Sequence, residues 1–136
     1  MALLDVNALV ALAWDTHVHH EAMAAWFDER IGPWATCPVS EAGFVRISSN
    51  PKVLTGVLSA DEARGVLADL RELGEHRFLV SDVSMTDADV PRIVGHRQVT
   101  DALLLTVARR ASVPLVTFDA AIATLAGGLG IELLRR

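Results

Sequence analysis

Four acidic residues stand at comparable places in the chain, each directly after an apolar run or in the first turn of an expected helix. They are Asp5, Glu41, Asp101 and Asp119. Each alone has an ordinary explanation, because a carboxylate in the first turn stabilises a helix by roughly 0.3–1 kcal/mol. Together they suggest other chemistry, since carboxylate oxygens bind Mg²⁺ and such ions promote in-line displacement at phosphorus.

Regularly alternating strands and helices must position these acids. Apolar runs predict strands at 3–5, 34–37, 77–80, 114–117 and 131–134, and helical periodicity predicts helices at 7–14, 18–29, 41–47, 60–73, 101–110 and 120–125. The alternation predicts an α/β fold with a parallel sheet and helices on both faces, as one domain over residues 1–136. Strand carboxyl ends and helix amino ends then share one edge, where all four carboxylates can meet.

Convergence of the acids has an electrostatic cost. Four like charges in one crevice repel, and burying them costs several kcal/mol unless something neutralises them. A divalent cation is the simplest counter-charge. If the acids are instead spread around the rim as helix caps, the chain is a non-catalytic α/β interaction module.

Local signals set the expected helix boundaries. Ser40 and Thr100 are expected N-caps, and Ser59 with Glu62 forms a capping box. Gly74 is expected to close the helix that follows Ser59. Residues 81–95 are the least regular part, for which we expect a short helix or turn whose acids are caps or solvated surface.

Composition limits the possible functions. Hydrophobic residues make up 51% of the chain, and no apolar run approaches the roughly 18 residues of a membrane span. No basic segment precedes a long apolar run, so we expect no signal peptide. The single cysteine, Cys37, is expected to be a small buried hydrophobe in a reducing, cytoplasmic setting. The net charge of −5 argues against nonspecific nucleic-acid binding unless cations or a partner neutralise the acids.

Two other features invite alternative interpretations. His17, His19 and His20 could bind a metal, but their spacing is unlike that of zinc sites, and a loop entering a helix explains them better. A phosphoacceptor signalling domain would need a lysine after a late strand. Lys52 is the only lysine and lies in the wrong region.

The motifs together resemble the PIN-domain ribonucleases, and within them the VapC toxins of bacterial VapBC toxin–antitoxin pairs. The resemblance spans residues 3–134, and the order and spacing of the four acids are its specific part. Residues 41–51 and 95–102 are close to one VapC subgroup. Leu103 departs from the pattern, because similar toxins often have an aromatic residue there, which concerns packing rather than the acids.

The resemblance implies a three-layer α/β/α sandwich and a Mg²⁺-dependent endoribonuclease, with Mn²⁺ possible. It assigns catalysis and metal binding to Asp5, Glu41, Asp101 and Asp119. Asn7 and Thr117 match flanking polar positions that help to hold the metals or their water. A metal-activated water would cut RNA to leave 5′-phosphate and 3′-hydroxyl ends.

The resemblance also implies partners. A VapB-like antitoxin would hold the toxin inactive by packing an apolar helix, often with an arginine, near the acids. A mean hydropathy of +0.36 is consistent with hidden surface, and we expect a homodimer. Three arginines, Arg46, Arg97 and Arg109, could steer the RNA backbone or be ordinary surface charges.

Overall fold

A parallel five-stranded sheet forms the centre of the computed structural model, which describes residues 1–51 and 58–135. The sheet order is β3-β2-β1-β4-β5, and every neighbouring pair is parallel. The strands are β1 (Ala2–Leu4), β2 (Trp34–Thr36), β3 (His76–Phe78), β4 (Leu115–Thr117) and β5 (Ile131–Leu133). The predicted parallel sheet is therefore confirmed, and each strand lies within a few residues of its expected place.

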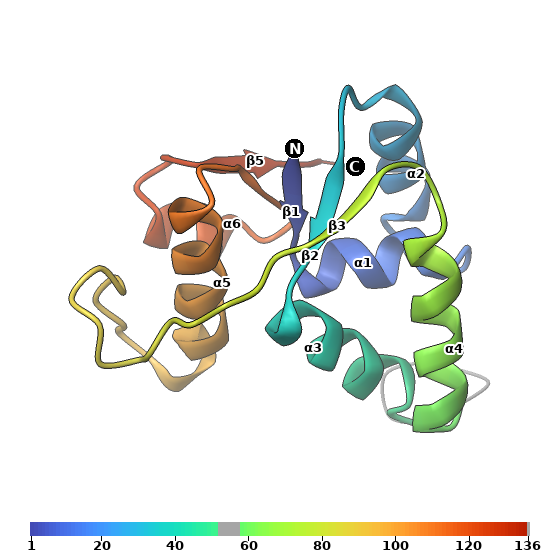
Figure 1. Cartoon of the computed structure of the whole chain (residues 1–136), viewed down its shortest axis with the longest axis horizontal. Coiled ribbons are helices and arrows are strands. Elements are labelled where there is room, and N and C mark those ends of the chain that lie inside the picture. Colours follow the sequence, from blue (N-terminus) through green and yellow to red (C-terminus); the bar gives the residue numbers. More distant parts are fainter. Residues whose placement is uncertain (52–57, 136) are drawn as a thin grey trace.

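Six helices lie around the sheet in the part of the chain that the structure describes. They are α1 (Val6–Ala13), α2 (His20–Glu29), α3 (Pro38–Ser48), α4 (Ala60–Arg71), α5 (Val99–Arg110) and α6 (Ala120–Leu125), with a 3₁₀ turn, η1 (His96–Gln98), before α5. Figure 1 shows α5 and α6 on the left and α2 and α4 on the right, with β1 and β2 between them. This is the predicted α/β/α arrangement. Within residues 1–51 and 58–135, every helix is too short or too polar to cross a bilayer.

The three central strands are completely buried, which fixes the sheet inside the molecule. Every residue of β1, β2 and β4 is buried, as expected for parallel strands covered on both faces. Trp34 and Phe44 are the largest fully buried side chains. Cys37 is a free, buried thiol, as predicted. Lys52, used above to exclude a phosphoacceptor domain, lies outside the described residues.

Two of the predicted helix caps were wrong. α3 begins at Pro38, so Ser40 lies inside the first turn, where its hydroxyl accepts a hydrogen bond from the Cys37 N–H at 2.9 Å. Proline favours the first helical position because it lacks an N–H, and the helix therefore starts earlier than expected. α5 follows directly on η1, so Gln98 rather than Thr100 occupies its N-cap position, without a side-chain capping hydrogen bond.

The other two boundary signals were correct. The Ser59 hydroxyl accepts a hydrogen bond from the Glu62 N–H, and the Glu62 carboxylate accepts one from the Ser59 N–H, both at 3.0 Å. Gly74 has φ +56°, which is the left-handed conformation that follows many helices. α4 is thus defined at both ends by local sequence.

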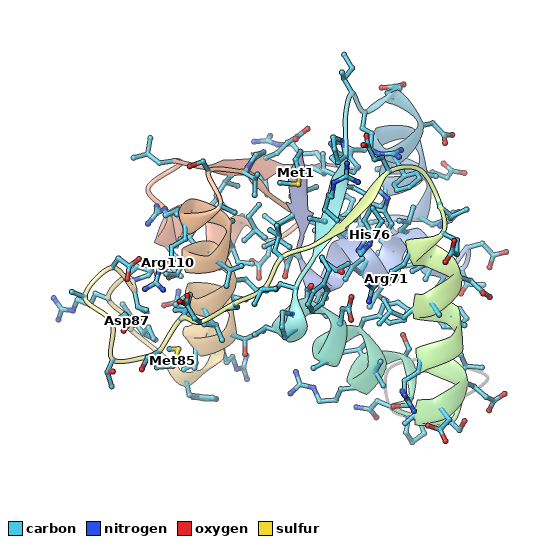
Figure 2. The ribbon with its side chains drawn as sticks, in the orientation of Figure 1. Met1, Arg71, His76, Met85, Asp87 and Arg110 are labelled. Carbon is cyan, nitrogen blue, oxygen red and sulfur yellow. The ribbon has the colours of Figure 1, made fainter. Side chains whose placement is uncertain are left out.

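Residues 81–95 contain turns but no helix, and their acids are tied to α5. The Arg110 guanidinium contacts Asp87 at 2.7 Å, Asp89 at 2.7 Å and Asp82 at 3.3 Å. Figure 2 shows Arg110 beside Asp87 at the left of the molecule. The expectation that these acids are caps or solvated surface is confirmed in part, because Asp87 accepts a hydrogen bond from the Ser84 N–H at 2.9 Å and the Asp82 side chain is 96% exposed. It did not include their pairing with a cation 21 to 28 residues away in the sequence.

Replacing Arg110 should release this segment without unfolding the protein. We expect Arg110→Ala to speed amide hydrogen exchange in residues 82–94 while the strands keep their protection, because these contacts are local and solvent-exposed. Arg64→Ala is the matched control, since Arg64 pairs only with Asp61 of its own helix. Unchanged exchange in residues 82–94 would show that the arginine does not order them.

Candidate functional site

Asp5 lies at the carboxyl end of β1 and is almost completely buried, with 3% of its surface exposed. Its carboxylate accepts hydrogen bonds from the Val6 N–H at 2.7 Å and from the Thr117 hydroxyl at 2.8 Å. Burial raises the pKa of Asp5; the two hydrogen bonds oppose this effect, and the charge of Asp119 adds to it. Asp5 is therefore a buried acid without a cationic partner among the described residues.

Thr117 joins Asp5 to Asp119. Its buried hydroxyl donates to Asp5 and accepts from the Asp119 N–H at 3.0 Å. The Asp119 carboxylate in turn accepts from the Ala121 N–H at 2.8 Å and caps α6. The two acids follow β1 and β4, the adjacent strands between which the strand order reverses. In open α/β sheets this switch point is where ligands bind.

Asp101 completes a group of three acids. It lies in the first turn of α5, and none of the hydrogen bonds found among the described residues involves its carboxylate. Burial raises the pKa of Asp101 to about 6, and the negative charges of Asp5 and Asp119 contribute. The charges of Asp5 and Asp119 thus both act on the Asp101 carboxylate. We call Asp5, Asp101 and Asp119 the acid cluster.

Glu41 lies in a separate network. Its carboxylate accepts a hydrogen bond from the Thr36 hydroxyl at 2.6 Å and pairs with Arg71 at 3.2 Å. It is not among the charges that raise the pKa of Asp5 or Asp101. The structure therefore brings three of the four predicted acids into one electrostatic group and directs the fourth to a cation.

His76 extends the Glu41 network. Its Nε2 lies 2.8 Å from the Thr36 hydroxyl oxygen, and its ring packs edge-on against Trp34. Because the single hydroxyl proton of Thr36 is donated to Glu41, Nε2 of His76 must carry the proton that Thr36 accepts. Burial, with the charges of Arg71 and Arg77, lowers the pKa of His76 to about 4, so the ring is neutral at neutral pH.

Sequence reasoning missed the residues around Glu41. Figure 2 shows Arg71 and His76 close together, although one ends α4 and the other begins β3. Arg71 reaches Glu41 through the packing of α3 on α4, and His76 reaches Thr36 through the pairing of β2 with β3. Thr36 itself lies only five residues before Glu41. Arg71 and His76 have no signature at a local spacing, so only the tertiary structure identifies them.

The donor chemistry of the acid cluster suits a hard divalent cation, although its side chains are not arranged as a finished site. Within residues 1–51 and 58–135, no three His, Cys, Asp or Glu side chains are placed to hold a metal together. The raised pKa of Asp101 shows that its negative charge is poorly compensated. A cation with carboxylate and water ligands would offset both the burial and the like charges that raise this pKa, so the residue types suit such an ion although their present arrangement does not hold one.

The polar residues predicted to flank the acids, and the three arginines predicted to steer RNA, differ in burial and contacts. Asn7 is exposed beside the cluster, whereas Thr117 is buried in it. Arg46 and Arg97 are exposed, and Arg109 donates to the Ala126 carbonyl at 3.0 Å, which satisfies the end of α6. Nothing in these contacts directs the three arginines toward the acids.

The three histidines do not form a metal site. Nδ1 of His17 accepts a hydrogen bond from the His19 N–H at 3.0 Å, and Nδ1 of His20 lies 2.7 Å from the Ala11 carbonyl. His19 stacks on Phe118. The loop interpretation of this segment therefore holds for the described residues.

A groove of about 810 Å³ lies between α3 and α4. Val45, Leu67 and Ala68 supply apolar wall, and Glu41 with Arg71 lies at its border. The groove thus adjoins the fourth acid and offers apolar surface beside charged groups.

A family model and curated relatives assign the chain to the same family. The PIN domain family matches residues 2–128. Ribonuclease VapC38 of Mycobacterium tuberculosis is 63% identical over 128 residues, covering 93% of this chain and 90% of that protein. Ribonuclease VapC39 of the same species is 43% identical over 137 residues, covering 98% of this chain and 99% of the relative.

A solved structure supports the fold. The crystal structure of Mycobacterium tuberculosis VapC20, described as a Sarcin-Ricin loop cleaving toxin, superposes with a TM-score of 0.61. It covers 91% of this chain and 94% of that one at 12% sequence identity. At this identity the likeness shows a shared fold alone.

The acid cluster should make metal-free stability depend on pH. The folded pKa of Asp101, about 6, exceeds its ordinary value of 3.8, so stability is full below about pH 4 and falls as pH rises through 6. We expect Asp101→Asn to equal wild type near pH 4 and to exceed it near pH 7. After discounting for solvent screening, the gain is on the order of 1 kcal/mol.

Urea unfolding in EDTA at several pH values measures this difference. Asp61→Asn, an exposed carboxylate on α4, is the control and should follow wild type at each pH. A clear loss of stability in Asp101→Asn at pH 7 would show that Asp101 serves the fold as a helix-capping acid.

Proposed function

We propose that this chain, which belongs to the PIN-domain family and within it to the VapC ribonucleases, is the toxin of a type II toxin–antitoxin pair and hydrolyses RNA phosphodiester bonds. The whole chain, residues 1–136, would act as one nuclease domain. The single observation that carries the chemistry is the acid cluster at the β1/β4 switch point. It gathers negative charge where the fold binds ligands and supplies no cation of its own.

Each acid has a distinct proposed role. Asp5 is fixed by Val6 and Thr117 and would provide a rigid carboxylate at the floor of the site. Asp101 is without a hydrogen bond among the described residues and would be the adaptable ligand. Asp119 is held at one oxygen by the α6 N-terminus and keeps the other for a ligand. Asn7, exposed at the start of α1, would orient water or a phosphate oxygen.

Glu41 would join the acid cluster when its contact with Arg71 opens. Thr36 and His76 position the Glu41 carboxylate from the sheet side, and Arg71 holds it from α4. A divalent cation, for which we propose Mg²⁺ with Mn²⁺ as a substitute, would supply an activated water and neutralise charge on the phosphoryl oxygens. Attack by water would leave a 5′-phosphate and a 3′-hydroxyl.

We further propose that a VapB-like antitoxin restrains the enzyme and that the toxin is a homodimer acting in the cytoplasm. The apolar groove between α3 and α4 adjoins Glu41 and suits an apolar helix of such an antitoxin. Ile31, Val80 and Val94 are among the large exposed apolar side chains that contacts between copies would cover.

Cleavage of RNA should require the metal and Asp101. We expect purified protein to cut structured RNA in Mg²⁺ and to stop cutting in EDTA. Asp101→Asn should lose roughly 100-fold or more of the cleavage rate, because it removes a ligand of the cation that would stabilise the transition-state charge. Gel analysis of end-labelled RNA measures the rate and identifies the ends. Asp61→Asn should retain wild-type cleavage, and activity that persists in EDTA would overturn the proposal.

Arg71 should compete with the metal for Glu41. We expect Arg71→Ala to lower the Mg²⁺ concentration needed for half-maximal cleavage by up to about fivefold, the factor equivalent to about 1 kcal/mol for a partly exposed ion pair. Arg64→Ala removes an arginine from the same helix and should leave the requirement unchanged. A higher Mg²⁺ requirement in Arg71→Ala would mean that Arg71 supports the active arrangement.

A further inference from the structure

A second hollow, of about 400 Å³, lies directly beside the acid cluster. Its lining comes from the start of α1, from the loop before α2 and from the turn after β4, and includes Asn7, His17, His19, Phe118 and Asp119. Asp119 belongs to both places, because its charge also raises the pKa of Asp5 and Asp101. A strand whose phosphate lies at the acids therefore has a neighbouring nucleotide within reach of this hollow.

Three of the residues that line the hollow carry aromatic rings. His19 lies face to face with Phe118, with ring centres 4.3 Å apart and planes 6° from parallel. His17 is 5.6 Å from His19, tilted by 41°. Nδ1 of His19 is buried without a hydrogen-bond partner in the described protein, so the stack rather than a bond at that nitrogen holds the ring. Flat aromatic side chains are the usual platform for nucleobases, and because His19 and Phe118 cover each other's inner faces, a base would lie against an outer face or an edge of this stack.

The charge of the hollow argues against a phosphate occupant. No lysine or arginine is among its lining residues, and Asp119 contributes negative charge. Its other polar groups suit an uncharged ligand. Because Nδ1 of His17 accepts from the His19 N–H, Nε2 of the neutral ring carries a donor proton, and the exposed Asn7 amide can both donate and accept.

We propose that this hollow binds one nucleobase of the RNA strand, that of a nucleotide next to the cleaved phosphodiester. The inference rests on the proposed function in taking RNA as the ligand. Base contacts here would give the enzyme a preference for unpaired nucleotides, since a base must leave its helix to reach aromatic side chains and hydrogen-bonding groups together.

Binding measured without metal tests the inference apart from catalysis. The probes are a fluorescein-labelled single-stranded RNA of about 12 mixed nucleotides and an abasic strand with the same phosphates. In EDTA, anisotropy titrations should show wild type binding the base-bearing strand roughly 5- to 100-fold more tightly. Phe118→Leu and His17→Ala should each lower that ratio by about threefold or more and leave affinity for the abasic strand unchanged.

Leu129→Ala is the matched control, because Leu129 is 72% exposed in the turn before β5, at the opposite edge of the sheet. It should keep the wild-type ratio, and thermal melts confirm folding. If Phe118→Leu fails to fold, the affinity ratio measured with His17→Ala alone tests the inference. A ratio near one in wild type, or wild-type ratios in both variants, overturns the inference.

Cleavage in Mg²⁺ separates this inference from the proposed function. Cutting by wild type together with unchanged ratios in the variants would retain the nuclease and remove the base site. Absence of cutting together with lowered ratios would retain the base site and remove the nuclease.

Discussion

Burial of the Asp5 carboxylate without a cation is the constraint on which the rest of the site depends. A buried charge costs several kcal/mol unless it is paired or well hydrogen-bonded. Here a backbone N–H and the Thr117 hydroxyl supply the only compensation found in the described residues. Thr117 must therefore stand at the end of β4, next to β1, and its position also fixes the Asp119 backbone. The pairing of β1 with β4 therefore determines how Asp5 and Asp119 are placed.

The strands, the parallel sheet and the positions of Asp5 and Asp119 could be predicted from the sequence, because each is indicated by residues close together in the chain. Apolar runs identified all five strands, and alternation with helices identified the parallel sheet, since a parallel connection requires a crossover. Asp5 and Asp119 could be placed at one edge because each directly follows a buried strand. Ser40 and Thr100 were assigned as caps from residue type alone, whereas Pro38 and η1 set the true helix starts.

The Glu41 surroundings could not be predicted, for a physical reason. Glu41 was placed with the other acids by its position in a first helical turn, but the direction of a long side chain depends on its neighbours. Arg71 is 30 residues away from Glu41 in the sequence, and His76, which contacts Thr36 beside it, is 40 residues away from Thr36. The contacts of Arg110 could not be predicted for the same reason, since it pairs with three aspartates that look like solvated surface in the sequence. Long-range ion pairs of this kind have no signature at fixed spacing.

The distribution of charge around the acids bears on how RNA would be held. With a net charge of −5 and an acid cluster that lacks arginine, the protein has little of the counterion-releasing surface on which nonspecific nucleic-acid binding depends. Arg71 is committed to Glu41, Arg109 to the end of α6 and Arg110 to residues 82–89. Arg46 and Arg97 are exposed and remain available to the phosphate backbone, and a cation held by the acids would add attraction close to the cleaved bond. Under the proposed function, such a site would depend on local shape and base contacts close to the cleaved bond, because a net charge of −5 leaves little long-range attraction for any strand.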